Sequence, residues 1–229
     1  MAIPALTLYH FLTFAWYFFI MFSVSMLKGD KQPSGVFMYG GPWKYLTILN
    51  VVLQTIFYGV SFVADLLAPI SKLGCVKLIQ SCKDLLFTVL AFPVAMFVFT
   101  SFWGLYTYNR ELVYPEGIDE FIPLWLNHAM HTAIFPLTLM ETLATPHRYP
   151  QKKRGLGLLG FFSFSYLCWV LWIYIAVGEW VYPLLGLLSP VGFLAFTSTS
   201  LVLIASIYII GDIINGLTWG AAEARQKLK

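Results

Sequence analysis

The segment 47-TILNVVLQTIFYGVSFVAD-65 decides the fold of this chain. It is almost entirely apolar, and about 20 such residues suffice for a helix to cross the hydrocarbon core of a bilayer. Its polar residues follow one another at gaps of 3, 4, 4, 3 and 4 positions, which places them on one face of a helix. They are Thr47, Asn50, Gln54, Tyr58, Ser61 and Asp65. The pattern predicts a membrane helix whose polar stripe faces other helices.

The rest of the chain has the same character. Of its 229 residues, 59% are hydrophobic and only 11% are charged, whereas a soluble domain carries about a quarter charged residues. Six long apolar runs lie at about 4–27, 43–67, 84–108, 122–143, 157–177 and 191–214. A membrane β-barrel would instead show alternating segments of about ten residues. The sequence therefore predicts an all-α, polytopic membrane protein, with residues 1–229 forming a single bundle of six transmembrane helices.

The basic residues predict how this bundle is oriented. The N-terminus, the second and fourth loops and the tail carry ten of the 14 Lys and Arg residues: Lys72, Lys77, Lys83, Arg148, Lys152, Lys153, Arg154, Arg225, Lys227 and Lys229. The other three loops carry four: Lys28, Lys31, Lys44 and Arg110. Because cytosolic loops are enriched in Lys and Arg, we expect both termini in the cytosol, which agrees with an even number of spans.

Several classes of function lack any signal. No run of basic residues interleaved with aromatics indicates nucleic-acid binding, and we expect no metal and no cofactor. Cys75, Cys82 and Cys168 do not have metal-ligand spacing and are an odd number, so we interpret them as reduced thiols. Reversible acylation of Cys75 and Cys82, which flank a predicted membrane surface, is an alternative.

The fourth run carries a second polar cluster. Asn127 and His131 are four residues apart, and His128 and His131 are three apart, so they are neighbours on one side of a helix. This cluster and Thr47 both lie in the part of their spans nearest the non-cytosolic face. The clusters are therefore predicted to share a cavity in the outer half of the bilayer.

A hydroxyl beside an imidazole is the smallest unit of nucleophilic catalysis, because the neutral imidazole can take the hydroxyl proton near pH 7. The span carboxylates are all expected near cytosolic ends, where snorkelling and helix-end roles explain them: Asp65, Asp84, Glu141 and Asp212. A dyad oriented by an amide, from Asn50 or Asn127, is thus favoured over a triad with a carboxylate. The competing interpretation is a polar seam that only joins helices.

Five segments resemble the androgen-induced protein family. They are 43-WKYLT-47, 53-LQTIFYG-59, 91-AFPV-94, 122-IPLWLNHAMHT-132 and 180-WVYP-183. The resemblance covers nearly the whole chain in the same order and includes uncommon Trp, His and Pro positions. It implies a multi-pass membrane hydrolase that cleaves fatty acid esters of hydroxy fatty acids.

The resemblance also implies the residues that act. Thr47 matches the nucleophilic threonine of the family and His131 its partner histidine. Asn50, Asn127 and His128 are candidates for orienting this pair or for donating hydrogen bonds to the oxyanion. Lys44 and Arg110 are candidates for contacting the carboxylate of the lipid substrate. The partners expected are this substrate and the bilayer, in the plasma membrane by preference, with the lysine-containing tail leaving the endoplasmic reticulum open.

Three other functions stay open on the sequence alone. The first is a non-enzymatic membrane regulator that acts through protein partners, a role that the name of the family reflects. The second is a membrane haem protein with His10 and His131 as axial ligands. The third is a small transporter, although the sequence contains no internal repeat.

Overall fold

The computed structural model describes residues 4–27, 39–70 and 74–227, and these segments contain helices and no strands. The α-helices are α1 (Ala5–Ser25), α2 (Leu46–Leu67), α3 (Gly74–Leu86), α4 (Phe92–Tyr108), α5 (Leu124–His131), α6 (Ile134–Ala144), α7 (Lys152–Val177), α8 (Pro183–Leu187) and α9 (Pro190–Lys227). Four short 3-10 helices are η2 (Gly41–Lys44), η3 (Ala68–Ile70), η5 (Arg110–Leu112) and η6 (Glu116–Ile118), and η4 (Phe87–Ala91) is a single π-helical turn. The all-α prediction is confirmed.

Five of the described helices are long and apolar enough to cross a membrane. They are Ala5–Ser25, Leu46–Leu67, Val76–Tyr108, Lys152–Val177 and Pro190–Gly220. The third combines α3, η4 and α4 into one helix of 33 residues, so it begins before the predicted start at residue 84. The fifth and sixth predicted spans also extend further than their apolar runs. The chain is thus a multi-pass integral membrane protein.

The fourth predicted span differs from the prediction of one continuous helix. It consists of α5 and α6, separated by a turn at Thr132 and Ala133. Pro136 has no backbone N–H to donate to the carbonyl of Thr132, four residues earlier, and this missing bond interrupts the helix. With α5 and α6 together as one crossing, six crossings remain our prediction.

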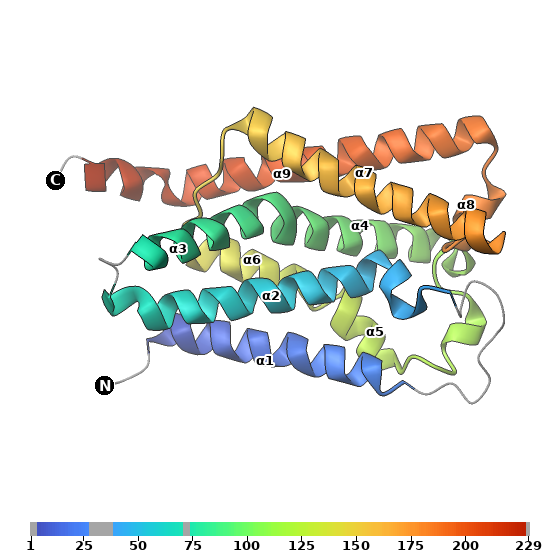
Figure 1. Ribbon diagram of the computed structural model, residues 1–229, viewed down its shortest axis with the longest axis horizontal. Helices are drawn as coiled ribbons and strands as arrows, with labels where there is room; N and C mark the ends of the chain where they lie inside the picture. The colour runs from blue at the N-terminus through green and yellow to red at the C-terminus, as the bar shows by residue number, and fades with distance from the viewer. Residues whose placement is uncertain (1–3, 28–38, 71–73, 228–229) are drawn as a thin grey trace.

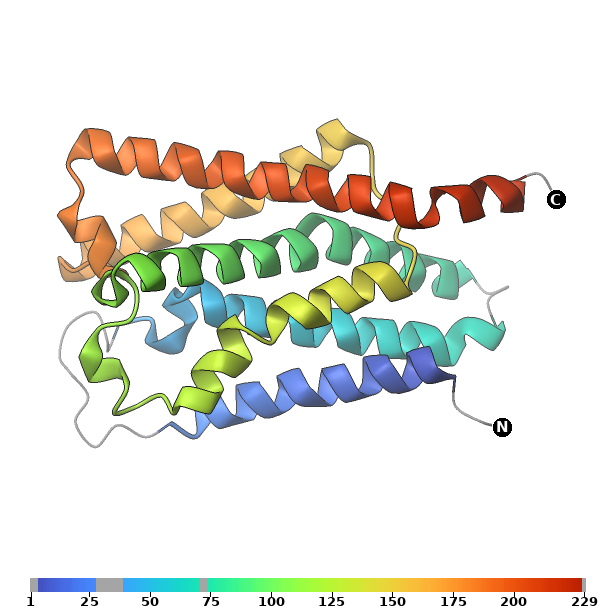
Figure 2. The same cartoon turned by 180° about the vertical axis from the view of Figure 1, so that it is seen from behind.

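The helices run side by side in one bundle (Figures 1 and 2). In both views α1 lies at one edge, α7 and α9 lie at the other, and α2, α4 and the α5–α6 pair lie between them. The start of α1 and the end of α9 are at the same end of the bundle (Figure 1). This placement fits an even number of crossings. Lys28, Lys31, Lys72 and Lys229, which entered the charge count, lie outside the described residues.

The core forms around α2. Its residues Val51, Phe57 and Tyr58 are at most 1% exposed and pack with Tyr17 of α1 and Phe87 of η4 in the largest apolar cluster. The predicted polar stripe of α2 also faces inward. Four of its members are buried, and Thr47 and Asp65 at its two ends are half-buried.

A chain of ion pairs connects four elements at the end of the bundle where the termini lie. Asp65 contacts His10 Nδ1 at 2.7 Å, and His10 Nε2 contacts Glu141 at 3.0 Å. The other Glu141 oxygen contacts His147 Nε2 at 3.1 Å, and His147 Nδ1 contacts Asp84 at 3.3 Å. The side chains of His10 and Glu141 are fully buried. The expectation of a simple helix-end role for Glu141 is therefore wrong, because its carboxylate links two buried imidazoles.

The first prediction concerns topology. Epitope tags added at either terminus should be inaccessible to antibody in intact cells and accessible after permeabilisation, because the basic residues favour the cytosol for both ends. Immunofluorescence with and without detergent measures this. Labelling of one tag in intact cells would contradict the orientation.

The second prediction concerns the ion-pair chain. Glu141→Gln should lower the free energy of unfolding by about 3–5 kcal/mol, because it removes the central charge between two buried partners. Thermal unfolding of the purified protein in detergent measures the loss. Glu120→Gln, at an exposed loop position, is the matched control and should unfold like the wild type.

Candidate active site

Thr47 and His131, predicted to meet, are in hydrogen-bond contact. The hydroxyl Oγ1 of Thr47 lies 3.0 Å from Nε2 of His131. Thr47 is the second residue of α2, and His131 is the last residue of α5, directly before the turn that separates α5 from α6. The break in the fourth span thus occurs beside the imidazole that contacts α2.

The imidazole of His131 is fixed from two further directions. Its Nδ1 lies 2.7 Å from the side-chain oxygen Oδ1 of Asn127 and 3.0 Å from the backbone carbonyl of the same residue. Both oxygens are acceptors, so Nδ1 carries the proton and Nε2 presents its lone pair to Thr47. The ring of Phe102, on α4, stacks on the imidazole with centroids 3.5 Å apart and an angle of 11°. His131 is 5% exposed.

The pair lies on the wall of an elongated, mostly apolar cavity of about 740 Å³. On α7 the lining runs from Leu159 to Val170, and on α9 from Phe193 to Ile204. Each range corresponds to about 16 Å at the helical rise of about 1.5 Å per residue. The volume lies in the upper part of the range of about 300–1,000 Å³ that small-molecule pockets occupy. The cavity is therefore long and large enough to receive an acyl chain.

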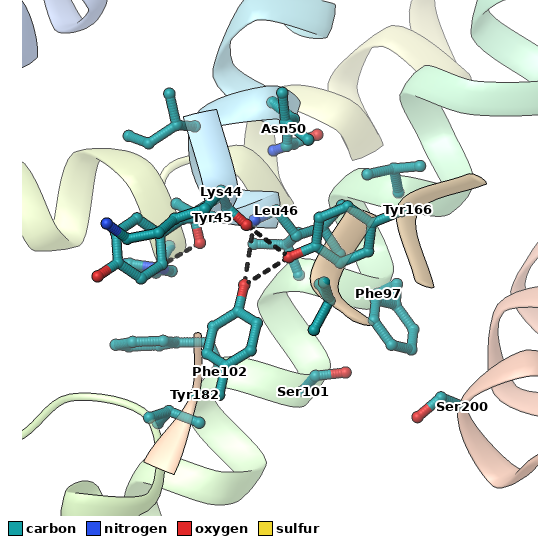
Figure 3. Close-up of a pocket in the computed structure, with 18 of the residues that line it drawn as sticks. Lys44, Tyr45, Leu46, Asn50, Phe97, Ser101, Phe102, Tyr166, Tyr182 and Ser200 are labelled. Carbon is teal, nitrogen blue, oxygen red and sulfur yellow. Dashed lines mark hydrogen bonds between the residues drawn. The ribbon is translucent and has the colours of Figure 1, made fainter. Parts of the chain in front are cut away.

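Two tyrosines hold the start of α2, directly before Thr47 (Figure 3). The backbone N–H of Leu46 donates to the hydroxyl of Tyr182 at 3.0 Å, and this hydroxyl lies 3.0 Å from that of Tyr166. Tyr166 donates in turn to the backbone carbonyl of Lys44 at 3.0 Å. The sequence did not predict either role, although Tyr182 belongs to one of the family segments. Both roles depend on the approach of α7 and α8 to α2.

The other candidate residues are not all at the cavity. Asn50 and Lys44 line it. Lys44 is 1% exposed, and burial lowers the pKa of its ammonium group. Arg110 is not among the lining residues, and its guanidinium donates to Asp119 at 2.6 Å. His128 is exposed, contacts Thr132 at 2.9 Å and stacks on Trp103. Arg110 and His128 are thus not among the residues that line the cavity.

The two histidines considered as haem ligands, His10 and His131, have both ring nitrogens in contact with other residues. Both ring nitrogens of His10 contact carboxylates, those of Asp65 and Glu141, and both nitrogens of His131 contact Thr47 and Asn127. Among the residues that the structure describes, no group of three or more His, Cys, Asp or Glu side chains is arranged to hold a metal ion.

Comparisons with known proteins agree with the resemblance seen in the sequence. The family model described as FAR-17a/AIG1-like protein matches residues 5–216. Androgen-dependent TFPI-regulating protein from Mus musculus is 47% identical over 221 residues, covering 96% of each chain, and that from Homo sapiens is 48% identical over 223 residues, covering 97% of each. Androgen-induced gene 1 protein from Homo sapiens is 36% identical over 209 residues, 88% of this chain and 87% of the relative. No solved structure gives a significant match.

The tyrosine contacts generate a prediction about stability. Tyr182→Phe should lower the free energy of unfolding by about 1–3 kcal/mol, because the N–H of Leu46 loses its acceptor in a partly buried site. Thermal unfolding in detergent measures this. Tyr108→Phe, at a position 83% exposed, removes a hydroxyl without removing such a contact. Equal unfolding of the two variants would contradict the role of Tyr182.

Proposed function

The chain belongs to the FAR-17a/AIG1-like protein family, and from this membership we propose that it is a membrane-embedded hydrolase. Its substrates would be fatty acid esters of hydroxy fatty acids, and its products a fatty acid and a hydroxy fatty acid. The observation that carries the proposal is the 3.0 Å contact between Thr47 Oγ1 and His131 Nε2 on the wall of a long apolar cavity.

The substrate explains why the site would lie within the membrane. The ester joins two acyl chains and leaves one free carboxylate, so the molecule dissolves in the bilayer. An intramembrane site meets it without extraction into water. The cavity accepts an acyl chain, and Lys44 on its wall is the residue we propose for the carboxylate. Arg110 is not proposed for this role, because its guanidinium is paired with Asp119 and Arg110 is not among the lining residues.

The first half of the reaction forms an acyl-threonine. Oγ1 of Thr47 attacks the ester carbonyl carbon while its proton passes to Nε2 of His131. The tetrahedral intermediate then expels the alcohol oxygen of the hydroxy fatty acid, which takes the proton from Nε2 as it leaves. Oδ1 of Asn127 assists by accepting a hydrogen bond from the Nδ1–H group, because this contact keeps the lone pair of Nε2 directed at Thr47.

The second half releases the fatty acid. A water molecule gives a proton to Nε2 and attacks the acyl-threonine carbonyl. Collapse of this second intermediate breaks the bond to Oγ1, which recovers the proton from His131. The enzyme returns to its starting state, and the sum of the two halves is hydrolysis of one ester bond.

A regulatory role is the second candidate function, because relatives of this chain are named as TFPI-regulating proteins. In that function the chain would act through protein partners and influence the anticoagulant TFPI without hydrolysis. Cells that express Thr47→Ala distinguish the two roles. A regulatory effect that survives the loss of hydrolysis is independent of the active site, whereas one that disappears with it depends on the lipid reaction. We propose the plasma membrane as the location for either role.

The central prediction concerns the catalytic pair. Thr47→Ala and His131→Ala should each abolish ester hydrolysis, and Thr47→Ser should retain part of it because a hydroxyl remains. Activity is measured as release of hydroxy fatty acid by the purified protein in lipid or detergent. Labelling with an alkyl fluorophosphonate, followed by peptide mapping, should identify position 47 as the modified residue.

Two control variants match the pair in chemistry. Thr100→Ala removes an exposed hydroxyl that bonds only its own helix backbone, and His128→Ala removes the neighbouring imidazole on the outer side of α5. Both should hydrolyse the ester like the wild type. Full activity of Thr47→Ala or His131→Ala would refute the mechanism.

A further inference from the structure

We propose that the side-chain amide of Asn50 donates a hydrogen bond to the oxyanion of the reaction, and that Gln54 sets the direction in which this amide points. The inference rests on the proposed hydrolysis by Thr47 and His131. It adds one catalytic residue and one positioning residue on the same face of α2.

The direction of the amides is set by a backbone carbonyl. The side-chain atom Nε2 of Gln54 lies 2.8 Å from the carbonyl oxygen of Ala91 in η4. A carbonyl oxygen can only accept, so the atom of Gln54 that faces it must be the NH2 group. Ala91 ends a wide π-turn formed by Phe87–Ala91, two residues before Pro93. Such turns occur frequently at functional sites.

The orientation of the Gln54 amide also determines the orientation of the Asn50 amide. The Gln54 Nε2 atom also lies 3.1 Å from Asn50 Oδ1. Because Gln54 presents a donor, Asn50 must present its oxygen, and its own NH2 group points elsewhere. The carbonyl of Ala91 therefore determines the orientation of both amides. With either amide turned round, one of the two contacts would no longer join a donor to an acceptor.

The NH2 group of Asn50, a residue of the cavity lining, is left without an acceptor within the described part of the chain. Asn50 is 0% exposed, and its Nδ2 has no hydrogen-bond partner within the described part of the chain. The residue is among those that line the cavity and is labelled in the close-up (Figure 3). A buried donor without an acceptor is unfavourable for folding. A negatively charged oxygen bound in the cavity would complete its hydrogen bonding.

The position of Asn50 fits the path of the reaction. It follows Thr47 by three residues, about 4.5 Å along the axis of the same helix and on the same face. Attack by Thr47 Oγ1 places the developing oxyanion close to this wall. Thr47 itself lies in the first turn of α2, where the helix dipole also favours negative charge.

The other amide and imidazole candidates lie elsewhere. Asn127 contacts Nδ1 of His131, on the side of the ring opposite the nitrogen that faces Thr47, and is not among the cavity-lining residues. His128 is exposed on the outer side of α5. Asn50 is thus the candidate amide whose free donor and location both suit the oxyanion.

The experiment compares two nearly isosteric variants. Asn50→Leu removes the donor. Gln54→Glu replaces the NH2 group by oxygen, so that Asn50 turns its NH2 toward position 54 and its oxygen toward the cavity. Each should lower kcat about 10²–10³-fold, the usual effect of losing one oxyanion donor, with KM unchanged. Gln54→Met, which leaves the Asn50 amide free to rotate, should lower kcat less than Gln54→Glu.

A second measurement separates the chemical step from binding and folding. The rate at which an alkyl fluorophosphonate labels Thr47 should fall in parallel with kcat, because its phosphoryl oxygen occupies the same place as the oxyanion. Binding of a non-hydrolysable ether analogue of the substrate should not change. Ser61→Ala is the matched control: Ser61 is a buried member of the same stripe, remote from the cavity, and this variant should keep the wild-type kcat.

The outcomes distinguish this inference from the function on which it rests. Wild-type kcat in Asn50→Leu or Gln54→Glu, together with an inactive Thr47→Ala, would overturn the oxyanion assignment alone. Hydrolysis that survives in Thr47→Ala would instead refute the proposed function. A loss of kcat accompanied by an equal loss of analogue binding would show that Asn50 shapes the cavity, and this too would overturn the assignment.

Discussion

The polar groups of α2 depend on partners inside the protein, because the hydrocarbon of a bilayer offers none. This constraint organises the bundle. Thr47 meets α5, Gln54 meets the backbone of η4, and Tyr58 donates to the carbonyl of Leu137 in α6. Asp65, at the end of the helix, reaches His10 of α1. One polar stripe thus fixes the position of α2 against four other elements.

The two ends of the stripe have different chemical environments. At the end where the chain termini lie, carboxylates and imidazoles alternate in a continuous chain from Asp65 to Asp84. At the other end the polar groups are few, and they adjoin a cavity that continues between apolar helices. At the first end both ring nitrogens of His10 and of His147 contact carboxylates of the protein. The second keeps a hydroxyl, an imidazole and an amide beside an open volume, which is the condition for acting on a ligand.

Two interruptions of regular helix lie beside residues of the candidate site. Pro136 breaks the fourth span just after His131, and the wide turn before Pro93 presents the Ala91 carbonyl to Gln54. The hydroxyl of Tyr182 accepts from the first N–H group of α2, directly before Thr47. In water such backbone groups could bond to solvent, whereas in a membrane each needs a side chain. The irregular elements and the polar side chains that accompany them therefore hold the candidate site in place.

The sequence by itself determined the membrane class, the stripe on α2 and the location of the six apolar runs, because these depend only on the order of apolar and polar residues along the chain. Together with the family resemblance it also singled out Thr47 and His131. Only the tertiary structure decided that Asn127 orients the imidazole, that Arg110 and His128 are not among the cavity-lining residues, and that Glu141 is buried between two histidines. These facts depend on the rotation and approach of helices distant in sequence, which helical periodicity does not fix. The free donor of Asn50 depends on the same approach, since its direction follows from a carbonyl 41 positions away on another helix.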